Sequence, residues 1–138
     1  MSDPLITPGR EHIVDAYGCR ESSLQSKETV QRLVARILAE MRLRVIGEPM
    51  WHVFPGPGGL TGLVMLAESH LSVHTFPEQR YAAVNLYCCR PTADWAWDAN
   101  LQEMLGAERV VVRTLVRAAA APPDAALAGL RPAQGAVR

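Results

Sequence analysis

Residues 68–78, Glu-Ser-His-Leu-Ser-Val-His-Thr-Phe-Pro-Glu, hold most of the side chains that could attack a carbonyl or move a proton. They include the Ser69 hydroxyl, the imidazoles of His70 and His74, and a carboxylate at each end, Glu68 and Glu78. The segment is otherwise strand-like, and a strand that only packs is rarely so polar, because each buried polar atom needs a partner. The segment is therefore expected to be exposed or to do chemistry.

Three familiar kinds of site do not fit these residues. A Ser-His-Asp hydrolase is not favoured, because no Gly-x-Ser-x-Gly elbow is present. On a strand His70 and His74 would lie about 13 Å apart, too far for one zinc ion with bonds of roughly 2.1 Å. Cys88 and Cys89 lack the spacing of a zinc pair, and the glycine-rich loop at 55–59 lacks the Gly-Lys-Ser/Thr of a phosphate-binding loop. We expect no metal site.

The composition limits the class of protein. The chain has 138 residues, 49% of them hydrophobic, and Lys plus Arg balances Asp plus Glu at 14 each. We expect one ordinary domain and no partner recognised by bulk charge, neither nucleic acid nor an anionic membrane. No apolar run approaches the about 20 residues of a membrane span, and the N-terminus lacks a secretory signal pattern. Three cysteines, two of them adjacent, favour a reducing cytoplasm over a disulfide framework.

The elements that must position these residues alternate between short strands and two helices. Ser26 is a candidate N-cap for an amphipathic helix of about 17 residues, and a second helix is expected to open at Pro91-Thr92 and to end at Gly106. Strands are expected at 12–17, 50–54, 60–67, 70–76, 81–89 and 109–116. This order predicts an α+β two-layer sandwich, an antiparallel sheet with two helices on one face.

One domain is expected over residues 1–117, with a loose arm at 1–10. The Ala/Pro-rich stretch at 118–138 is expected to be a flexible tail.

The most specific pattern in the chain is the block Glu-Ser-His-x-x-x-His-Thr-x-Pro-Glu at 68–78. It is accompanied by Gly59-Leu60-Thr61-Gly62, Tyr81-Ala82-Ala83-Val84-Asn85, Cys89 and the Tyr17-Gly18-Cys19 turn. Together these segments resemble the prokaryotic S-adenosylmethionine decarboxylase proenzyme family, and the resemblance runs from about His12 to Arg117.

The resemblance implies that the chain cuts itself between Glu68 and Ser69, giving residues 1–68 and 69–138. The Ser69 hydroxyl would attack the Glu68 carbonyl to form an ester, and β-elimination would leave a pyruvoyl group derived from Ser69. That carbonyl would form a Schiff base with the substrate amine and accept electrons as carbon dioxide leaves. Thr61 and His74 match residues that assist processing, and Cys89 matches the proton donor in catalysis.

The substrate site is also implied by the resemblance. Glu78 matches a carboxylate that holds the ribose hydroxyls, and Phe54 and Phe76 match aromatic residues beside the sulfonium and adenine groups. In this family the active sites lie at a homodimer interface, so Phe54, Phe76 and Glu78 are expected to serve the neighbouring subunit. The product would be decarboxylated S-adenosylmethionine, which is used for spermidine synthesis.

Some residues depart from the family pattern. Thr61 stands for a usual Ser, Phe76 for Trp, and Asn85 for Asp, and the loop before Thr61 is one residue longer. Cys88-Cys89-Arg90 replaces Thr-Cys-Gly. Arg90 either lowers the pKa of the neighbouring thiol or points to solvent. Two alternatives therefore stay open: a pyruvoyl decarboxylase of ornithine or arginine, and an unprocessed homologue that only binds a ligand or partner.

Overall fold

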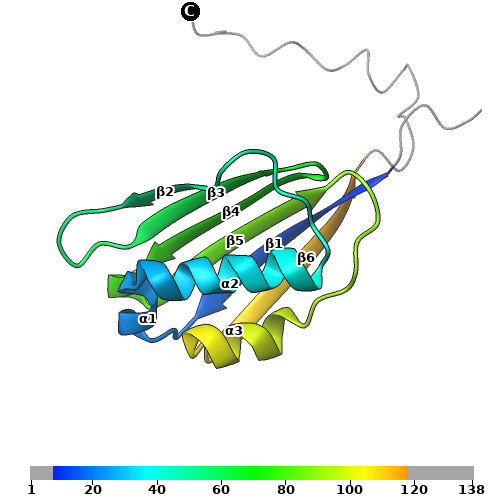
Figure 1. Cartoon of the computed structure of the whole chain (residues 1–138). Coiled ribbons are helices and arrows are strands. Elements are labelled where there is room, and N and C mark those ends of the chain that lie inside the picture. Colours follow the sequence, from blue (N-terminus) through cyan, green and yellow to red (C-terminus); the bar gives the residue numbers. More distant parts are fainter. Residues whose placement is uncertain (1–7, 118–138) are drawn as a thin grey trace, which may run out of the picture.

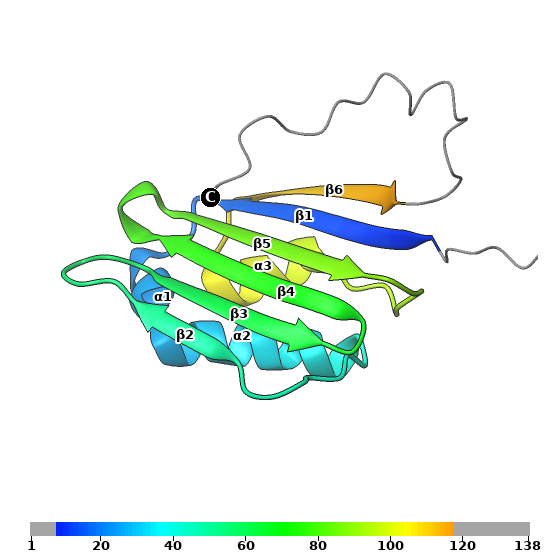
Figure 2. The ribbon, with the colours of Figure 1, turned by 90° about the horizontal axis from the view of Figure 1, so that it is seen from above.

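The computed structural model describes residues 8–117, which form one antiparallel sheet with helices packed on it. The six strands lie in the order β2-β3-β4-β5-β1-β6 (Figures 1 and 2). In chain order the elements are β1 (Gly9–Tyr17), α1 (Glu21–Gln25), α2 (Lys27–Glu40), β2 (Met50–Val53), β3 (Leu60–Leu66), β4 (Ser69–Phe76), the 3-10 turn η1 (Pro77–Gln79), β5 (Tyr81–Cys88), α3 (Trp97–Leu105) and β6 (Arg109–Arg117).

The helices cover one face of the sheet, which confirms the predicted α+β two-layer architecture (Figure 1). Figure 2 shows the strands in front of the helices, so the near face of the sheet carries no helix of the described segment. Between residues 8 and 117, no helix has the length and apolar character needed to cross a bilayer. The predicted tail at 118–138 lies outside the described residues.

α2 forms where the apolar spacing predicts it. The Ser26 hydroxyl caps the helix by accepting the Thr29 N–H at 3.1 Å. The side chains that face the sheet recur at three- and four-residue steps and are buried: Val30, Leu33, Val34 and Ile37. The helix has 14 residues, fewer than predicted. It ends early because Arg42 adopts a left-handed φ of 55° and turns the chain toward β2.

α3 begins later than predicted. The second helix was expected to open at Pro91-Thr92, but it begins at Trp97. Residues 91–96 are instead an irregular segment, held by long-range contacts: the Trp95 indole N–H donates to the Glu40 carboxylate of α2. The predicted end is confirmed, since Gly106 has a φ of 70° and donates its N–H to the Gln102 carbonyl at 2.9 Å.

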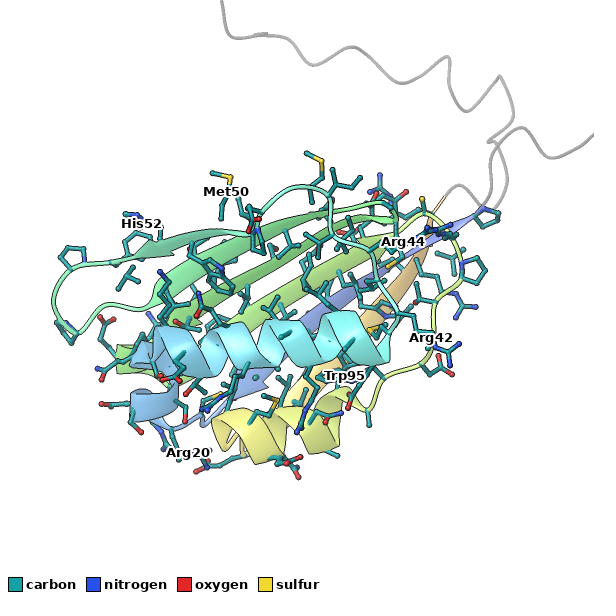
Figure 3. All side chains as sticks on the ribbon, in the orientation of Figure 1. Arg20, Arg42, Arg44, Met50, His52 and Trp95 are labelled. Atoms are coloured by element: carbon teal, nitrogen blue, oxygen red, sulfur yellow. The ribbon has the colours of Figure 1, made fainter. Side chains whose placement is uncertain are left out.

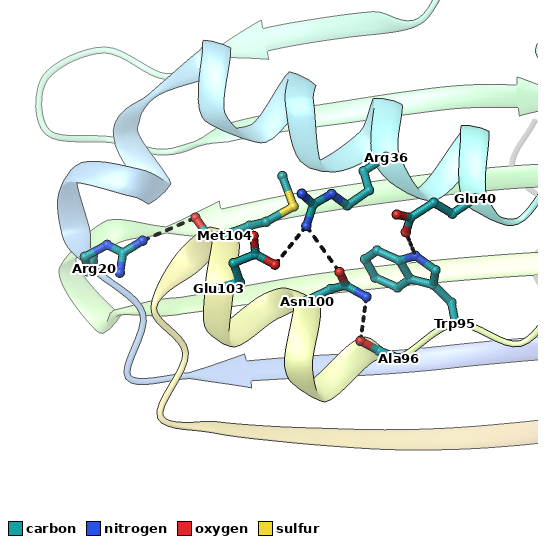
Figure 4. A network of polar contacts seen from close by, with 8 residues as sticks. All are labelled: Arg20, Arg36, Glu40, Trp95, Ala96, Asn100, Glu103 and Met104. Carbon is teal, nitrogen blue, oxygen red and sulfur yellow. Dashed lines mark hydrogen bonds and ion pairs between the residues drawn. The ribbon is translucent and has the colours of Figure 1, made fainter.

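Polar contacts join α2 to α3 across the space between the two helices (Figure 4). Arg36 donates to the Asn100 side-chain oxygen at 3.2 Å and to the Glu103 carboxylate at 3.1 Å. The five-residue helix α1 is not predicted by apolar spacing, because it is too short to show a period. The expected N-terminal arm is also too long, since β1 already begins at Gly9.

The β3–β4 hairpin sets the positions of the residues singled out above. Its turn is only two residues long, Ala67-Glu68, and Leu66 pairs with Ser69. At the other end of the same ladder Thr61 pairs with His74. β5 lies on the far side of β4, where Ser69 pairs with Cys88.

Hydrogen bonds of Thr75 connect the β3–β4 hairpin to the helix layer. Its buried hydroxyl accepts the Leu60 N–H at 2.9 Å and donates to the Leu24 carbonyl at 2.8 Å. Gly59 must be glycine here, because a Cβ would lie 1.9 Å from the Thr75 carbonyl oxygen. The strand, the preceding loop and α1 therefore meet at this one side chain.

We predict that Thr75→Val destabilises the fold by about 2 kcal/mol, because the Leu60 N–H and the Leu24 carbonyl lose their partner in a dry core. Thr114→Val, on exposed edge strand β6, should change stability by less than about 0.5 kcal/mol. Urea unfolding followed by circular dichroism measures both, in a Ser69→Ala background that keeps the chain whole if the expected cut occurs. Equal unfolding midpoints for the two variants would contradict the prediction.

Candidate active site

Candidate residues gather at two places, one at each end of the β3–β4 ladder. The first, called the hairpin end, comprises Glu68, Ser69, Cys89 and Arg90. The second, called the pocket end, comprises Phe54, Thr61, His74, Phe76 and Glu78.

At the hairpin end, Glu68 is held by its side chain and by its backbone. The carboxyl group is 3% exposed. One carboxyl oxygen accepts the Arg44 backbone N–H at 2.8 Å, and the other accepts Arg90 Nη2 at 2.9 Å. Burial alone would raise the pKa of this carboxyl, but these two donors outweigh it and leave the pKa below its ordinary value. Glu68 is therefore an ionised carboxylate with a fixed orientation.

The Glu68 carbonyl is also bound. The Cys89 backbone N–H donates to the Glu68 carbonyl oxygen at 2.7 Å. A short hydrogen bond of this kind polarises a carbonyl and stabilises negative charge that develops on its oxygen. The carbon of the Glu68–Ser69 peptide is thus made more open to nucleophilic attack.

The backbone at Ser69 is strained. Its φ is 149°, a value that L-residues rarely adopt. A residue held in such a region costs about 2 kcal/mol, and strain of this kind tends to occur at functional sites. Breaking the Glu68–Ser69 peptide would release it, because φ is then no longer constrained by the hairpin turn.

Of the two adjacent cysteines, only Cys89 is accessible. Cys88 ends β5 and is buried among the core side chains, and this burial raises the pKa of its thiol to about 11. Cys89 follows the strand and is exposed. The structure therefore favours Cys89 over Cys88 as the thiol that a ligand can reach.

At the pocket end, side chains of β3, β4 and η1 line a cavity of about 520 Å³. Thr61 Oγ1 and His74 Nδ1 form a hydrogen bond of 3.0 Å across the ladder. Phe76 stacks on Tyr81 with ring centroids 5.5 Å apart. Phe54 and Glu78 lie on the same cavity, so all five pocket-end residues face one space. Its volume suits a small organic ligand.

Within one chain the two ends do not meet. Ser69 and His74 are five residues apart on β4, which corresponds to about 17 Å along a strand. Five is also an odd spacing, so Ser69 follows the alternation of the helix-facing residues and His74 that of the open face. Figure 3 labels one residue near each end. Arg44, whose backbone N–H binds Glu68, lies near the hairpin end, and His52, which pairs with Thr61, lies at the opposite end of the sheet.

Three contacts at the hairpin end were not predicted from the sequence. The Arg90 guanidinium forms an ion pair with the Glu68 carboxylate. From the sequence, Arg90 was expected either to lower the pKa of the neighbouring thiol or to point to solvent. The backbone N–H groups of Arg44 and Cys89 also bind Glu68, and backbone donors leave no signal in a sequence.

Asn85, which departs from the family pattern, donates its side-chain amide N–H to the Glu11 carboxylate at 3.1 Å.

We predict that iodoacetamide at about pH 8 labels Cys89 first in the native protein, because Cys19 and Cys88 are buried. Burial raises the pKa of each buried thiol to about 11, so both stay protonated at that pH. Intact mass and peptide mapping should show one label on the folded protein and three after unfolding in urea. Labelling of Cys88 as fast as Cys89 would contradict the assignment.

Comparisons with known proteins agree with this geometry. The family model described as S-adenosylmethionine decarboxylase matches residues 10–118. A relative from Carboxydothermus hydrogenoformans, named S-adenosylmethionine decarboxylase proenzyme, is 36% identical over 111 residues, 79% of this chain and 85% of the relative. A relative of the same name from Moorella thermoacetica is 34% identical over 124 residues, 88% of this chain and 97% of the relative.

A solved structure gives the same result. The crystal structure of the adenosylmethionine decarboxylase from Aquifex aeolicus VF5 superimposes with a TM-score of 0.65 at 27% identity, covering 80% of this chain and 90% of that chain. The chain belongs to the S-adenosylmethionine decarboxylase family.

Proposed function

We propose that this chain cuts itself between Glu68 and Ser69 and then, as a pyruvoyl enzyme, converts S-adenosylmethionine to its decarboxylated form and carbon dioxide, the step that supplies spermidine synthesis. The observation that carries the proposal is the Glu68–Ser69 peptide itself. It lies in a two-residue hairpin turn, its carbonyl is bound by a 2.7 Å hydrogen bond, and the residue that follows has a strained φ of 149°.

The first step is an acyl shift. The Ser69 hydroxyl oxygen bonds to the Glu68 carbonyl carbon, the carbon–nitrogen bond breaks, and the hydroxyl proton ends on the freed amine of Ser69. The Cys89 N–H, already on the carbonyl oxygen, stabilises the charge that develops there. The backbone strain at Ser69 is relieved in the same step, and this relief favours the acyl shift.

The second step is an elimination. A base removes the Cα proton of Ser69 and Glu68 leaves as a carboxylate, which is a better leaving group than an amide nitrogen. The resulting dehydroalanine takes up water and loses ammonia, so the chain 69–138 begins with a pyruvoyl group. We assign the support of this processing to the Thr61–His74 pair, whose 3.0 Å hydrogen bond fixes the imidazole. Because this pair lies about 17 Å from Ser69 in its own chain, it would act on the Ser69 of a neighbouring chain.

The residues around Ser69 fit such a group. β4 stays paired with β5 from Ser69 onward, so the new chain start is held in place without the severed peptide. The pyruvoyl carbonyl supplies an electron sink for the loss of carbon dioxide. We assign the donation of a proton to the substrate carbon to the exposed Cys89 thiol, which is next to the residue paired with Ser69.

The pocket end is suited to hold the substrate. The rings of Phe54 and Phe76 can accept a sulfonium cation or stack on adenine, and the Glu78 carboxylate can accept hydrogen bonds from ribose hydroxyls. A cavity lined by aromatic rings suits this ligand better than the smaller ornithine or arginine.

We infer that the working unit is a homodimer, because the two ends of the ladder lie about 17 Å apart in one chain. The open sheet face exposes large apolar side chains, with Leu63 48% and Met65 63% exposed between the two ends and Phe76 41% exposed at the pocket end. A two-fold axis that lies in the interface, perpendicular to the strands, would turn a second copy end for end on this face, so that the hairpin end of one chain meets the pocket end of the other. Each dimer then holds two sites.

The setting we propose is the reducing cytoplasm. All three cysteines are unpaired, as is usual for proteins of that compartment. Two of them are buried thiols, which a reducing environment leaves intact.

We predict that Ser69→Ala stops both cleavage and decarboxylation, because it removes the attacking oxygen. Denaturing intact mass should show two chains for the wild type, 1–68 and 69–138, with no free amine on the second, and one chain for the variant. Carbon dioxide release should occur with S-adenosylmethionine and not with ornithine or arginine. Cleavage of the variant would refute the processing step, and turnover of ornithine or arginine by the wild type would refute the substrate.

A further inference from the structure

The ion pair between Arg90 and Glu68 crosses the proposed cut. Glu68 would end the chain 1–68, whereas Arg90 belongs to the chain 69–138. The guanidinium lies 2.9 Å from the carboxylate, and the carboxylate is almost fully buried while Arg90 is 45% exposed. A buried carboxylate is unfavourable without a cation or several hydrogen-bond donors. Arg90 is therefore the charge that allows Glu68 to stay in this position.

Two neighbouring residues of the second chain bind the same residue of the first. The Cys89 N–H binds the Glu68 carbonyl, and the Arg90 side chain binds the Glu68 carboxylate. Together with the Arg44 N–H at 2.8 Å, they fix residue 68 at three points. With its side chain fixed, Glu68 cannot rotate its carbonyl away from the Cys89 donor.

The charge at this position changes when the peptide breaks. Residue 68 then carries a new α-carboxylate beside its side-chain carboxylate. A cavity of about 280 Å³ adjoins Glu68, and Arg42, Arg44 and Arg90 all line it. Three cations around one acid give a local excess of positive charge, which suits a chain end with two negative groups.

We propose, on the basis of the proposed self-cleavage, that Arg90 is a positioning residue that holds residue 68 on both sides of the cut. Before the cut it keeps the Glu68 carbonyl against the Cys89 N–H. After the cut it binds the doubly charged chain end in the arginine-lined cavity, which keeps that end away from the group formed at residue 69.

Carboxypeptidase Y digestion of the cleaved protein tests the proposal, with the loss of residues from the end of chain 1–68 followed by intact mass. Arg90→Gln should be trimmed about tenfold faster than the wild type, because a charged hydrogen bond of usual strength is lost. Arg90→Lys should restore much of the protection, since it keeps the charge. Arg36→Gln is the matched control, because it removes a 3.1 Å ion pair between α2 and α3 and should trim like the wild type.

The outcomes separate the two proposals. If the wild type is never cut, the proposed function fails and no chain end exists to trim. If all the proteins are cut at one rate and Arg90→Gln resists trimming as well as the wild type, the role of Arg90 is overturned while self-cleavage stands. If Arg90→Gln folds by circular dichroism but is not cut, whereas Arg90→Lys is cut, the role before the cut is supported.

Discussion

The register of the β3–β4 ladder is the constraint on which the rest of the site depends. A two-residue turn at Ala67-Glu68 pairs Leu66 with Ser69, and the same ladder then has to pair Thr61 with His74. The turn also holds the backbone of Ser69 at a φ of 149°, a strained conformation directly after the Glu68–Ser69 peptide. A register shift of one residue would turn each side chain of β4 to the other face of the sheet. The residues of the hairpin end and of the pocket end would then no longer face their present neighbours.

The same register is the reason for proposing a dimer as the working unit. Ser69 with Cys89 lies at one end of the ladder and the Thr61–His74 pair at the other, and a rigid sheet cannot bend to bring them together. The open face between the ends exposes the large apolar side chains of Leu63 and Met65, 48% and 63% exposed, beside the polar His70 and Ser72. In the proposed dimer a second copy, placed end for end, would cover that face and complete two sites, which would give the exposed apolar residues and the divided site a common cause.

The sequence predicted those features of the fold that depend only on residues close to each other in the chain. The Ser26 cap and the Gly106 end depend on backbone groups within one turn, so residue type alone identifies them. The start of α3 and the Arg90–Glu68 pair depend on contacts between distant segments, 55 residues apart for Trp95 and Glu40 and 22 apart for Arg90 and Glu68. The separation of Ser69 from His74 was available from the sequence, since a spacing of five on a strand already places them at different ends and on different faces.

Activity of mixed dimers tests the shared site most directly. Cys89→Ala is expected to disable the hairpin end after cleavage, and Glu78→Gln is expected to disable the pocket end. Two affinity tags allow purification of the dimer that contains one chain of each. If each site combines two chains, this dimer keeps one intact site and about half of the wild-type activity per dimer. A dimer of wild type with the Cys89→Ala, Glu78→Gln double variant should then be inactive. The reverse pattern, an inactive first dimer and a half-active second, would show that each site lies within one chain and would contradict the account.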